Sequence, residues 1–162
     1  MAWNGRDGAR RRGAEFVGLI QHLGEGRVAV DTAVFIYFIE EHPMYLPLVE
    51  PLFAEVDAGR RELVTSALTL LEVLVVPYRA GDLQLAERYE AIFSRSRGLR
   101  VVDLDRGQLR TAAQIRATHG VRTPDALQLA AAFSERCQVF LTTDRRMPAL
   151  PGLRVVQLSD VN

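Results

Sequence analysis

The chain has 162 residues, 48% of them hydrophobic, so it is long and apolar enough to fold as one globular domain with its own core. Its formal net charge of +0 excludes attraction to nucleic acid through overall charge, and a local patch of its arginines, which are all 20 of its basic residues, would be needed instead. The single cysteine, Cys137, excludes an internal disulfide, and no apolar stretch is long enough for a membrane span, so we expect a cytoplasmic protein.

The N-terminal part is expected to contain a tail and an additional helix. Residues 1–13 are rich in glycine and arginine without any periodicity, which is typical of a flexible tail. An amphipathic pattern then predicts a helix within 14–26, and the main domain is expected over 27–162. The apolar residues with helical spacing in this segment are Phe16, Leu19, Ile20 and Leu23.

Short β-branched runs alternate with helical patterns through the main domain. Strands separated by helices pair in parallel through right-handed crossovers, so the pattern predicts an α/β three-layer sandwich with helices on both faces of a five-stranded sheet. The predicted strands are 27–31, 63–66, 99–104, 139–143 and 154–158. The predicted helices lie at about 32–40, along a stripe from Val49 to Val56, at 67–76 and 82–96, after Asp105 and after Thr123.

Several helix starts carry capping residues. Ser66 and Asp105 each precede a helical pattern and are expected to accept hydrogen bonds from its first N–H groups. Thr123 is expected to be an N-cap, followed by Pro124 at the first helical position and Asp125 in the first turn. The sequence therefore predicts that Asp125 lies at the start of a helix.

One predicted helix is unusual because it is apolar almost all round. The segment 67–76 is expected to be a buried helix that ends before Pro77. Glu72 lies in its middle, where an unpaired carboxylate would cost stability. The alternatives are therefore a buried arginine partner or a metal ion.

Three aspartates share a predicted edge of the sheet with Glu72. Asp31 and Asp144 follow predicted strands, and ligands bind beyond the carboxyl ends of parallel strands. Each aspartate also has a local explanation, since Asp31 could cap a helix, Asp125 could favour a helix dipole and Asp144 could form a turn. Four carboxylates that converge would favour a divalent cation.

Four segments together resemble a known family. They are V-A-V-D-T (28–32), L-E-V (71–73), R-T-P-D-A-L-Q-L-A-A-A (122–132) and F-L-T-T-D (140–144). In order and rough spacing they resemble the PIN-domain nucleases, especially VapC-type toxins of bacterial toxin-antitoxin pairs. The likeness extends from residue 27 to about 158.

The resemblance implies a sheet ordered 3-2-1-4-5 and a Mg²⁺- or Mn²⁺-dependent endoribonuclease with one or two ions. It further implies a homodimer that a cognate antitoxin inhibits. The acidic residues of the family correspond here to Asp31, Glu72, Asp125 and Asp144, and the hydroxyl before the last of them corresponds to Thr142.

The chemistry of phosphodiester hydrolysis assigns a role to each residue. We expect Asp31, Asp125 and Asp144 to hold the cation, which lowers the pKa of a water, and Glu72 to orient or deprotonate that water. Thr142 would position a carboxylate or a water. Arginine pairs well with phosphate, and the candidates for RNA contact flank the acidic residues: Arg122, Arg145 and Arg146.

Other functions are compatible with the same residues. The chain could be a PIN-domain nuclease that is not a toxin, or a PIN-like module that binds partners without catalysis. A phosphatase with an aspartyl nucleophile is disfavoured, since Asp31 is followed by Thr32 and Ala33 and lacks the expected D-x-D loop.

Overall fold

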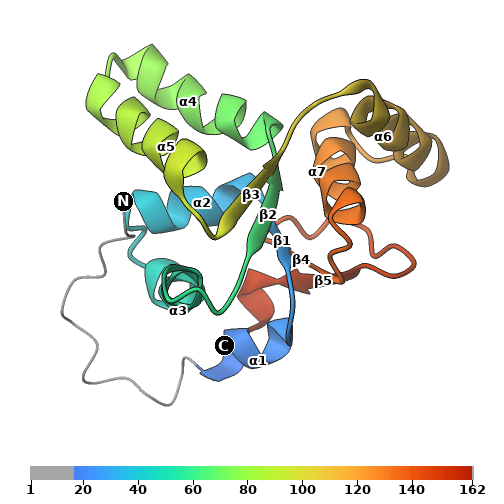
Figure 1. The fold of residues 1–162 in the computed structure, drawn as a ribbon, viewed down its shortest axis with the longest axis horizontal. Coiled ribbons are helices and arrows are strands. Elements are labelled where there is room, and N and C mark those ends of the chain that lie inside the picture. Colours follow the sequence, from blue (N-terminus) through green and yellow to red (C-terminus); the bar gives the residue numbers. More distant parts are fainter. Residues whose placement is uncertain (1–16, 162) are drawn as a thin grey trace.

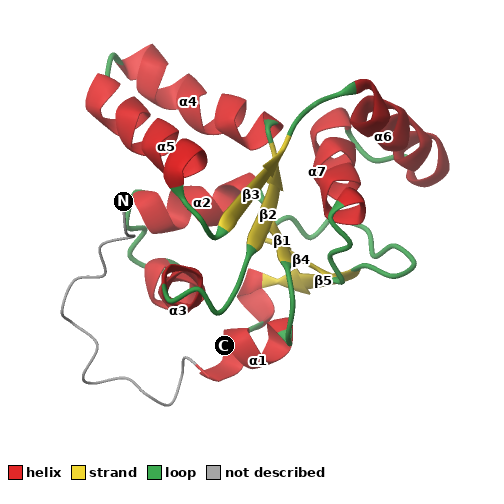
Figure 2. Ribbon diagram, in the orientation of Figure 1, coloured by secondary structure: helices red, strands yellow, loops and turns green. Residues whose placement is uncertain are grey.

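The computed structural model describes residues 17–161, in which short strands alternate with helices (Figures 1 and 2). The predicted tail at 1–13 lies outside the described residues. The strands are β1 (Val28–Val30), β2 (Leu63–Ser66), β3 (Leu99–Val102), β4 (Val139–Thr142) and β5 (Arg154–Gln157). The helices are α1 (Val17–Leu23), α2 (Thr32–Ile39), α3 (Leu46–Asp57), α4 (Leu68–Ala80), α5 (Leu83–Arg95), α6 (Arg106–His119), α7 (Thr123–Ser134) and the 3₁₀ turn η1 (Leu158–Asp160).

The strands form one sheet ordered β3-β2-β1-β4-β5, and every neighbouring pair is parallel. Ala29 in the central strand pairs with Val64 on one side and Phe140 on the other. The predicted fold class and strand order are confirmed. Because all strands run the same way, their carboxyl ends meet at one edge, and α2 and α4 begin there (Figure 1).

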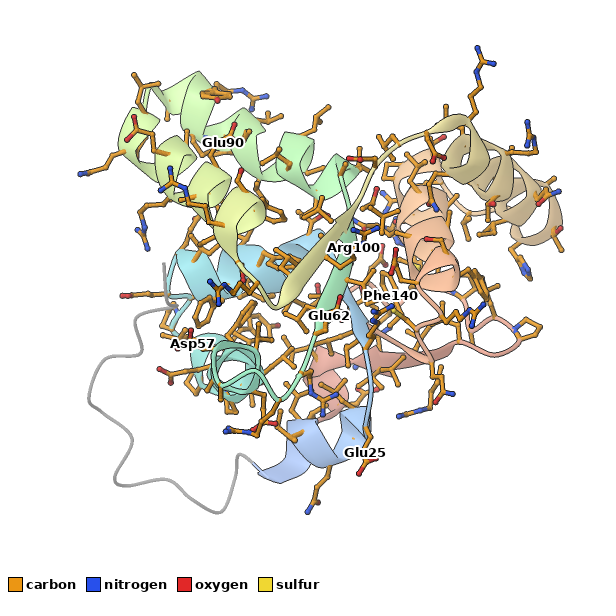
Figure 3. The ribbon with its side chains drawn as sticks, viewed as in Figure 1. Glu25, Asp57, Glu62, Glu90, Arg100 and Phe140 are labelled. Carbon is orange, nitrogen blue, oxygen red and sulfur yellow. The ribbon has the colours of Figure 1, made fainter. Side chains whose placement is uncertain are left out.

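The strands alternate their side chains between two cores. Val28 and Val30 of β1 belong to the core under α1 to α5, whereas Ala29 belongs to the core under α6 and α7. Phe140 of β4 is fully buried in the second core, beside α7 (Figure 3). The sheet is thus covered on both faces, and its strands are apolar on both sides as parallel strands must be.

The segment predicted to be an additional helix contains α1. Leu19 and Leu23 are buried in the first core. Arg61 donates to the backbone oxygens of Gly24, at 2.6 Å, and of Gly26, at 3.1 Å, and so ties the end of α1 to the segment before β2. The division of the chain at residue 27 stays a prediction. None of the helices within 17–161 is both long and apolar enough to cross a membrane.

The prediction that the helix containing Glu72 ends before Pro77 was wrong. Helix α4 continues through Pro77 to Ala80 and ends at Gly81, which has a positive φ of 70°. Pro77 is buried, and its carbonyl accepts from the backbone N–H of Asp82 at 2.9 Å. Packing of α4 against α5 therefore outweighs the missing N–H of the proline.

The prediction that this helix is buried all round was also wrong. One face of α4 packs into the core through Val73 and Leu74, while its other face is open to solvent. Since a helix that lies on one side of a sheet buries a single face, the apolar pattern overstated its burial. The large apolar residues exposed on α4 are Leu71, Val75, Val76 and Tyr78.

Two further boundaries differ from the prediction. Helix α7 begins at Thr123 itself, and its N-cap is Arg122, whose side chain makes no capping hydrogen bond. The third strand ends at Val102, because its partner β2 ends at Ser66, which pairs with Val102. The predicted cap at Asp105 is confirmed, since Asp105 accepts from the N–H of Gln108. The N-cap of α4 is Ala67 and not Ser66, although the hydroxyl of Ser66 does accept from the N–H of Leu68.

Candidate functional site

Asp31 lies at the junction of the two central strands. Its backbone N–H donates to the carbonyl of Leu141 in β4 at 3.0 Å, which extends the pairing of β1 with β4 by one residue. Its Oδ1 accepts from the N–H of Thr32 at 2.8 Å and caps α2. Its Oδ2 accepts from the hydroxyl of Thr142 at 2.6 Å. Both carboxylate oxygens are therefore held at the carboxyl edge of the sheet.

Thr142 joins two of the predicted acidic residues. It is fully buried as the last residue of β4, and its hydroxyl donates to Asp31 while accepting from the backbone N–H of Asp144 at 2.9 Å. The Nε2 of Gln157 in β5 also donates to the backbone oxygen of Asp144, at 3.0 Å. The loop that carries Asp144 is thus fastened to three neighbouring strands, β1, β4 and β5.

Glu72 reaches the same edge from α4. It is half-buried, and its Oε2 accepts a hydrogen bond from the hydroxyl of Thr32, the residue after Asp31. Burial raises the pKa of Glu72, as do the nearby charges of Asp31 and Asp125, while Thr32 and Arg122 act in the opposite direction. The direct partner of Glu72 is therefore a hydroxyl, and the positive charge of Arg122 acts on it from a greater distance.

Asp125 and Asp144 share an arginine. Arg122 donates to Asp125 through its Nε at 2.9 Å and its Nη2 at 3.3 Å, and the same Nη2 donates to Asp144 at 3.2 Å. Arg146 donates three hydrogen bonds to the carboxylate of Asp144, two from its guanidinium at 3.0 Å and one from its backbone N–H at 2.9 Å. The lone pairs of these two aspartates thus point at arginines in this structure.

The pKa values of two carboxylates in the cluster are shifted in opposite directions. Burial raises the pKa of Asp31, and the charges of Asp125 and Asp144 add to this effect. Hydrogen bonds from Arg146 instead lower the pKa of Asp144. Asp31 and Glu72 therefore lie where further negative charge is unfavourable and a cation would be stabilised, whereas Asp144 is already neutralised by arginine.

Two of the three arginines predicted to contact phosphate lie at the acidic cluster, and the third does not. Arg122 and Arg146 lie over the acidic residues, but Arg145 points elsewhere and donates to Ser159 and to Asp160, each at 2.9 Å. The positions of Arg122 and Arg146 are compatible with the predicted contact to a substrate at the cluster. Arg145 is engaged with η1, because the turn after Asp144 directs the two consecutive arginines to different sides.

The donor set suits a hard divalent cation, although the side chains are not arranged as a finished site. Among residues 17–161, no three acidic, histidine or cysteine side chains are grouped closely enough to hold an ion as they stand. Carboxylates are the ligands that Mg²⁺ and Mn²⁺ prefer, and mutual repulsion links Asp31 to Asp125 and Asp144. For Asp125 and Asp144 to act as ligands, Arg122 and Arg146 would have to release their oxygens.

Sequence reasoning missed a group of polar residues beneath Glu72. A chain of hydrogen bonds joins five buried residues, in which Ser66 takes part through its backbone N–H: Thr32, Thr65, Ser66, Thr69 and Gln128. Gln128, like Glu72, is a polar side chain inside an apolar helical segment, D-A-L-Q-L-A-A-A, and this pattern is the signal that points to it in the sequence.

The sequence matches the family model of the PIN domain over residues 28–153. This range contains the four acidic residues and Thr142. A search of curated protein sequences gives no significant match.

Several solved structures have the same fold as this chain. A chain of FitAB bound to an IR36 DNA fragment is 22% identical, with a TM-score of 0.61, over 82% of this chain and 94% of that one. A chain of VapBC2 from Rickettsia felis bound to promoter DNA is 16% identical, with a TM-score of 0.60, over 81% and 98%. VapC20 from Mycobacterium tuberculosis, a toxin that cleaves the sarcin-ricin loop, is 18% identical, with a TM-score of 0.58, over 71% and 87%.

Proposed function

The chain belongs to the PIN-domain family, and from this premise we propose that it is a Mg²⁺- or Mn²⁺-dependent endoribonuclease. The observation that carries the proposal is the convergence of Asp31, Glu72, Asp125 and Asp144 at one sheet edge, where burial and like charge raise the pKa of Asp31 and Glu72. Perturbed carboxylates gathered at the carboxyl edge of a parallel sheet are typical of a catalytic site.

Each residue of the cluster has a distinct role in this proposal. Asp31, Asp125 and Asp144 would hold the cation, and Thr142 would keep Asp31 oriented through its 2.6 Å hydrogen bond. When bound, a divalent cation neutralises phosphate oxygens and makes water more acidic. Glu72, whose pKa is raised by burial, would orient or deprotonate the attacking water.

The arginines over the cluster would contact RNA. Arg122 and Arg146 occupy oxygens of Asp125 and Asp144 in the free protein, and release from these carboxylates would leave two guanidinium groups beside the site. A guanidinium pairs with a phosphate through two parallel hydrogen bonds, so the released arginines would hold the RNA backbone. Arg145 would have to leave Asp160 to take part.

We further propose that the protein is the toxin of a toxin-antitoxin pair and forms a homodimer. The supporting observation is that structures with this fold include VapBC2 and a toxin-antitoxin complex from Klebsiella pneumoniae, the latter 18% identical with a TM-score of 0.57, over 83% of this chain and 98% of that one. The partner would be a small antitoxin encoded beside the gene. Its expression with this chain should relieve a growth arrest that the chain causes alone, and growth without arrest in both cultures would count against a toxin.

The nuclease proposal is tested with purified protein, total bacterial RNA and a set of fluorescently labelled single-stranded oligoribonucleotides. We expect cleavage in Mn²⁺ or Mg²⁺, none with excess chelator, and loss of cleavage in Asp31→Asn and Asp125→Asn. Asp160→Asn is the matched control, since Asp160 pairs with Arg145 outside the cluster. Full activity in Asp31→Asn would refute the assignment. Calorimetric binding of Mn²⁺ without cleavage of any RNA would favour a non-catalytic module.

A further inference from the structure

A buried polar network lies directly beneath Glu72. Its members come from elements far apart in the chain: α2, the end of β2, α4 and α7. All are 8% exposed or less, and buried polar groups are stable only when hydrogen-bonded to one another. The members are Thr32, Thr65, Ser66, Thr69 and Gln128.

Gln128 is the centre of this network, and the backbone fixes the orientation of its amide. The N–H of Ser66 can only donate, and it lies 3.2 Å from Oε1 of Gln128, so the oxygen must face β2. The Nε2 group then faces the opposite side, 2.6 Å from the hydroxyl oxygen of Thr69 and 3.3 Å from that of Thr32.

The amide orientation determines where the hydroxyl protons point. An NH₂ group cannot accept, so Thr32 and Thr69 both accept from Gln128, and their own protons must go elsewhere. The proton of Thr69 has Thr65 as its nearest acceptor, at 2.7 Å, and Thr65 in turn can donate to the carbonyl of Val30 at 3.1 Å. The proton of Thr32 has two oxygens within reach, that of Thr69 at 3.2 Å and Oε2 of Glu72, which is closer and belongs to the stronger acceptor, a carboxylate. Thr32 therefore donates to Glu72.

We propose that Gln128 is a positioning residue for Glu72, acting through the hydroxyl of Thr32. The ionised carboxylate of Glu72 can only accept from Thr32. By donating to the oxygen of the same hydroxyl, Gln128 fixes Thr32 in place and so holds the Glu72 carboxylate in one rotamer at the sheet edge, close to the carboxylates of Asp31 and Asp125. This inference rests on the proposed nuclease function for its catalytic consequence, but the direction of the hydrogen bonds is a property of the metal-free protein.

The catalytic consequence is tested with Gln128→Met, which keeps a similar volume and removes every hydrogen bond of the amide. On a labelled oligoribonucleotide that the wild-type protein cleaves, we expect kcat to fall about tenfold or more, with KM and the calorimetric Kd for Mn²⁺ unchanged. Gln108→Met is the matched control, because Gln108 is also a buried glutamine but lies on α6 and takes no part in the hydrogen bonds that join the network. In a Glu72→Gln background, Gln128→Met should cause no further loss of kcat.

A second measurement keeps the proposal testable without RNA, metal or a Gln128 variant. In the NMR spectrum of the metal-free protein, the side-chain amide resonances of Gln128 should shift in Glu72→Gln. They should not shift in Glu90→Gln, since Glu90 is an exposed residue of α5 (Figure 3). Unshifted resonances in Glu72→Gln, or a further fall of kcat when Gln128→Met is added to Glu72→Gln, would overturn the proposal. Shifted resonances in a protein that cleaves no RNA would support the hydrogen-bond relay and refute the nuclease function.

Discussion

Arg122 competes with a cation for the two aspartates that it bridges, so Arg122→Gln should strengthen metal binding. Its guanidinium lies 2.9 Å from Asp125 and 3.2 Å from Asp144. A cation that binds these carboxylates has to displace the arginine. Metal binding is therefore weaker by the free energy that the two ion pairs contribute. Removing the arginine removes this cost.

The expected gain in metal affinity depends on how exposed the paired side chains are. The side chain of Arg122 is 58% exposed, while those of Asp125 and Asp144 are 18% and 21% exposed, so the pairs lie near the upper end of the range for surface ion pairs. At about 0.5–1 kcal/mol for each carboxylate, the total is about 1–2 kcal/mol, or about a 5- to 30-fold lower Kd for the cation. Full Coulomb energies at low dielectric would overstate the effect, because water reaches the guanidinium.

Isothermal titration of Mn²⁺ into the wild-type protein and Arg122→Gln at constant ionic strength measures this change. Arg145→Gln is the matched control, because it also removes one positive charge, but from a pair with Asp160. We expect its Kd to stay within about twofold of the wild-type value, since the exposed guanidinium of Arg145 is paired with Asp160 and occupies no oxygen of the acidic cluster. An unchanged or higher Kd in Arg122→Gln would refute the idea that this arginine competes with the cation.

Three further changes have defined outcomes. Glu72→Gln should raise the thermal unfolding midpoint of the metal-free protein at pH 7. Because the pKa of Glu72 is higher in the folded state than in the unfolded state, the contribution of Glu72 to stability is lost as the pH rises from the ordinary carboxyl pKa through the folded-state pKa. Glutamine carries no charge and avoids this loss. Circular dichroism melts at pH 4 and pH 7 check this, and a lower midpoint than wild type at pH 7 would contradict it. Gly98→Ala should reduce the free energy of unfolding by about 1–3 kcal/mol in urea titrations, because its Cβ would clash with Val56 Cγ1 and lie 3.2 Å from the Val56 oxygen. Gly18→Ala, whose Cβ would meet ordinary contacts at 3.5 Å, is its control, and an equal loss in both would be inconsistent with the packing argument. Thr142→Val should weaken Mn²⁺ binding in calorimetry by freeing Asp31, and an unchanged Kd would remove Thr142 from the supporting residues.

The sheet and the edge at which the carboxylates meet could be predicted from the sequence, because the signals are local. Each strand is a short apolar run, and Asp31 and Asp144 follow such runs directly. Parallel pairing then brings distant strand ends to one edge without any knowledge of side-chain contacts. Asp125 was placed at a helix start by Thr123 and Pro124, although the helix begins one residue earlier than predicted.

The environment of each carboxylate depended on tertiary contacts that a sequence pattern does not contain. The pattern of α4 predicted burial all round, but α4 packs through one face and leaves Leu71 exposed. Glu72 is therefore half-buried and bound to Thr32, instead of being enclosed by apolar residues. The different directions of Arg145 and Arg146 arise from the turn after Asp144, which no periodicity encodes.

Anomalous X-ray scattering from crystals grown or soaked with Mn²⁺ shows directly whether this acidic edge binds a divalent cation. We expect an anomalous peak bounded by the carboxylates of Asp31, Asp125 and Asp144, with Arg122 moved away from Asp125. Density that shows Arg122 still bridging Asp125 and Asp144 at saturating Mn²⁺, with no anomalous peak at the cluster, would contradict it.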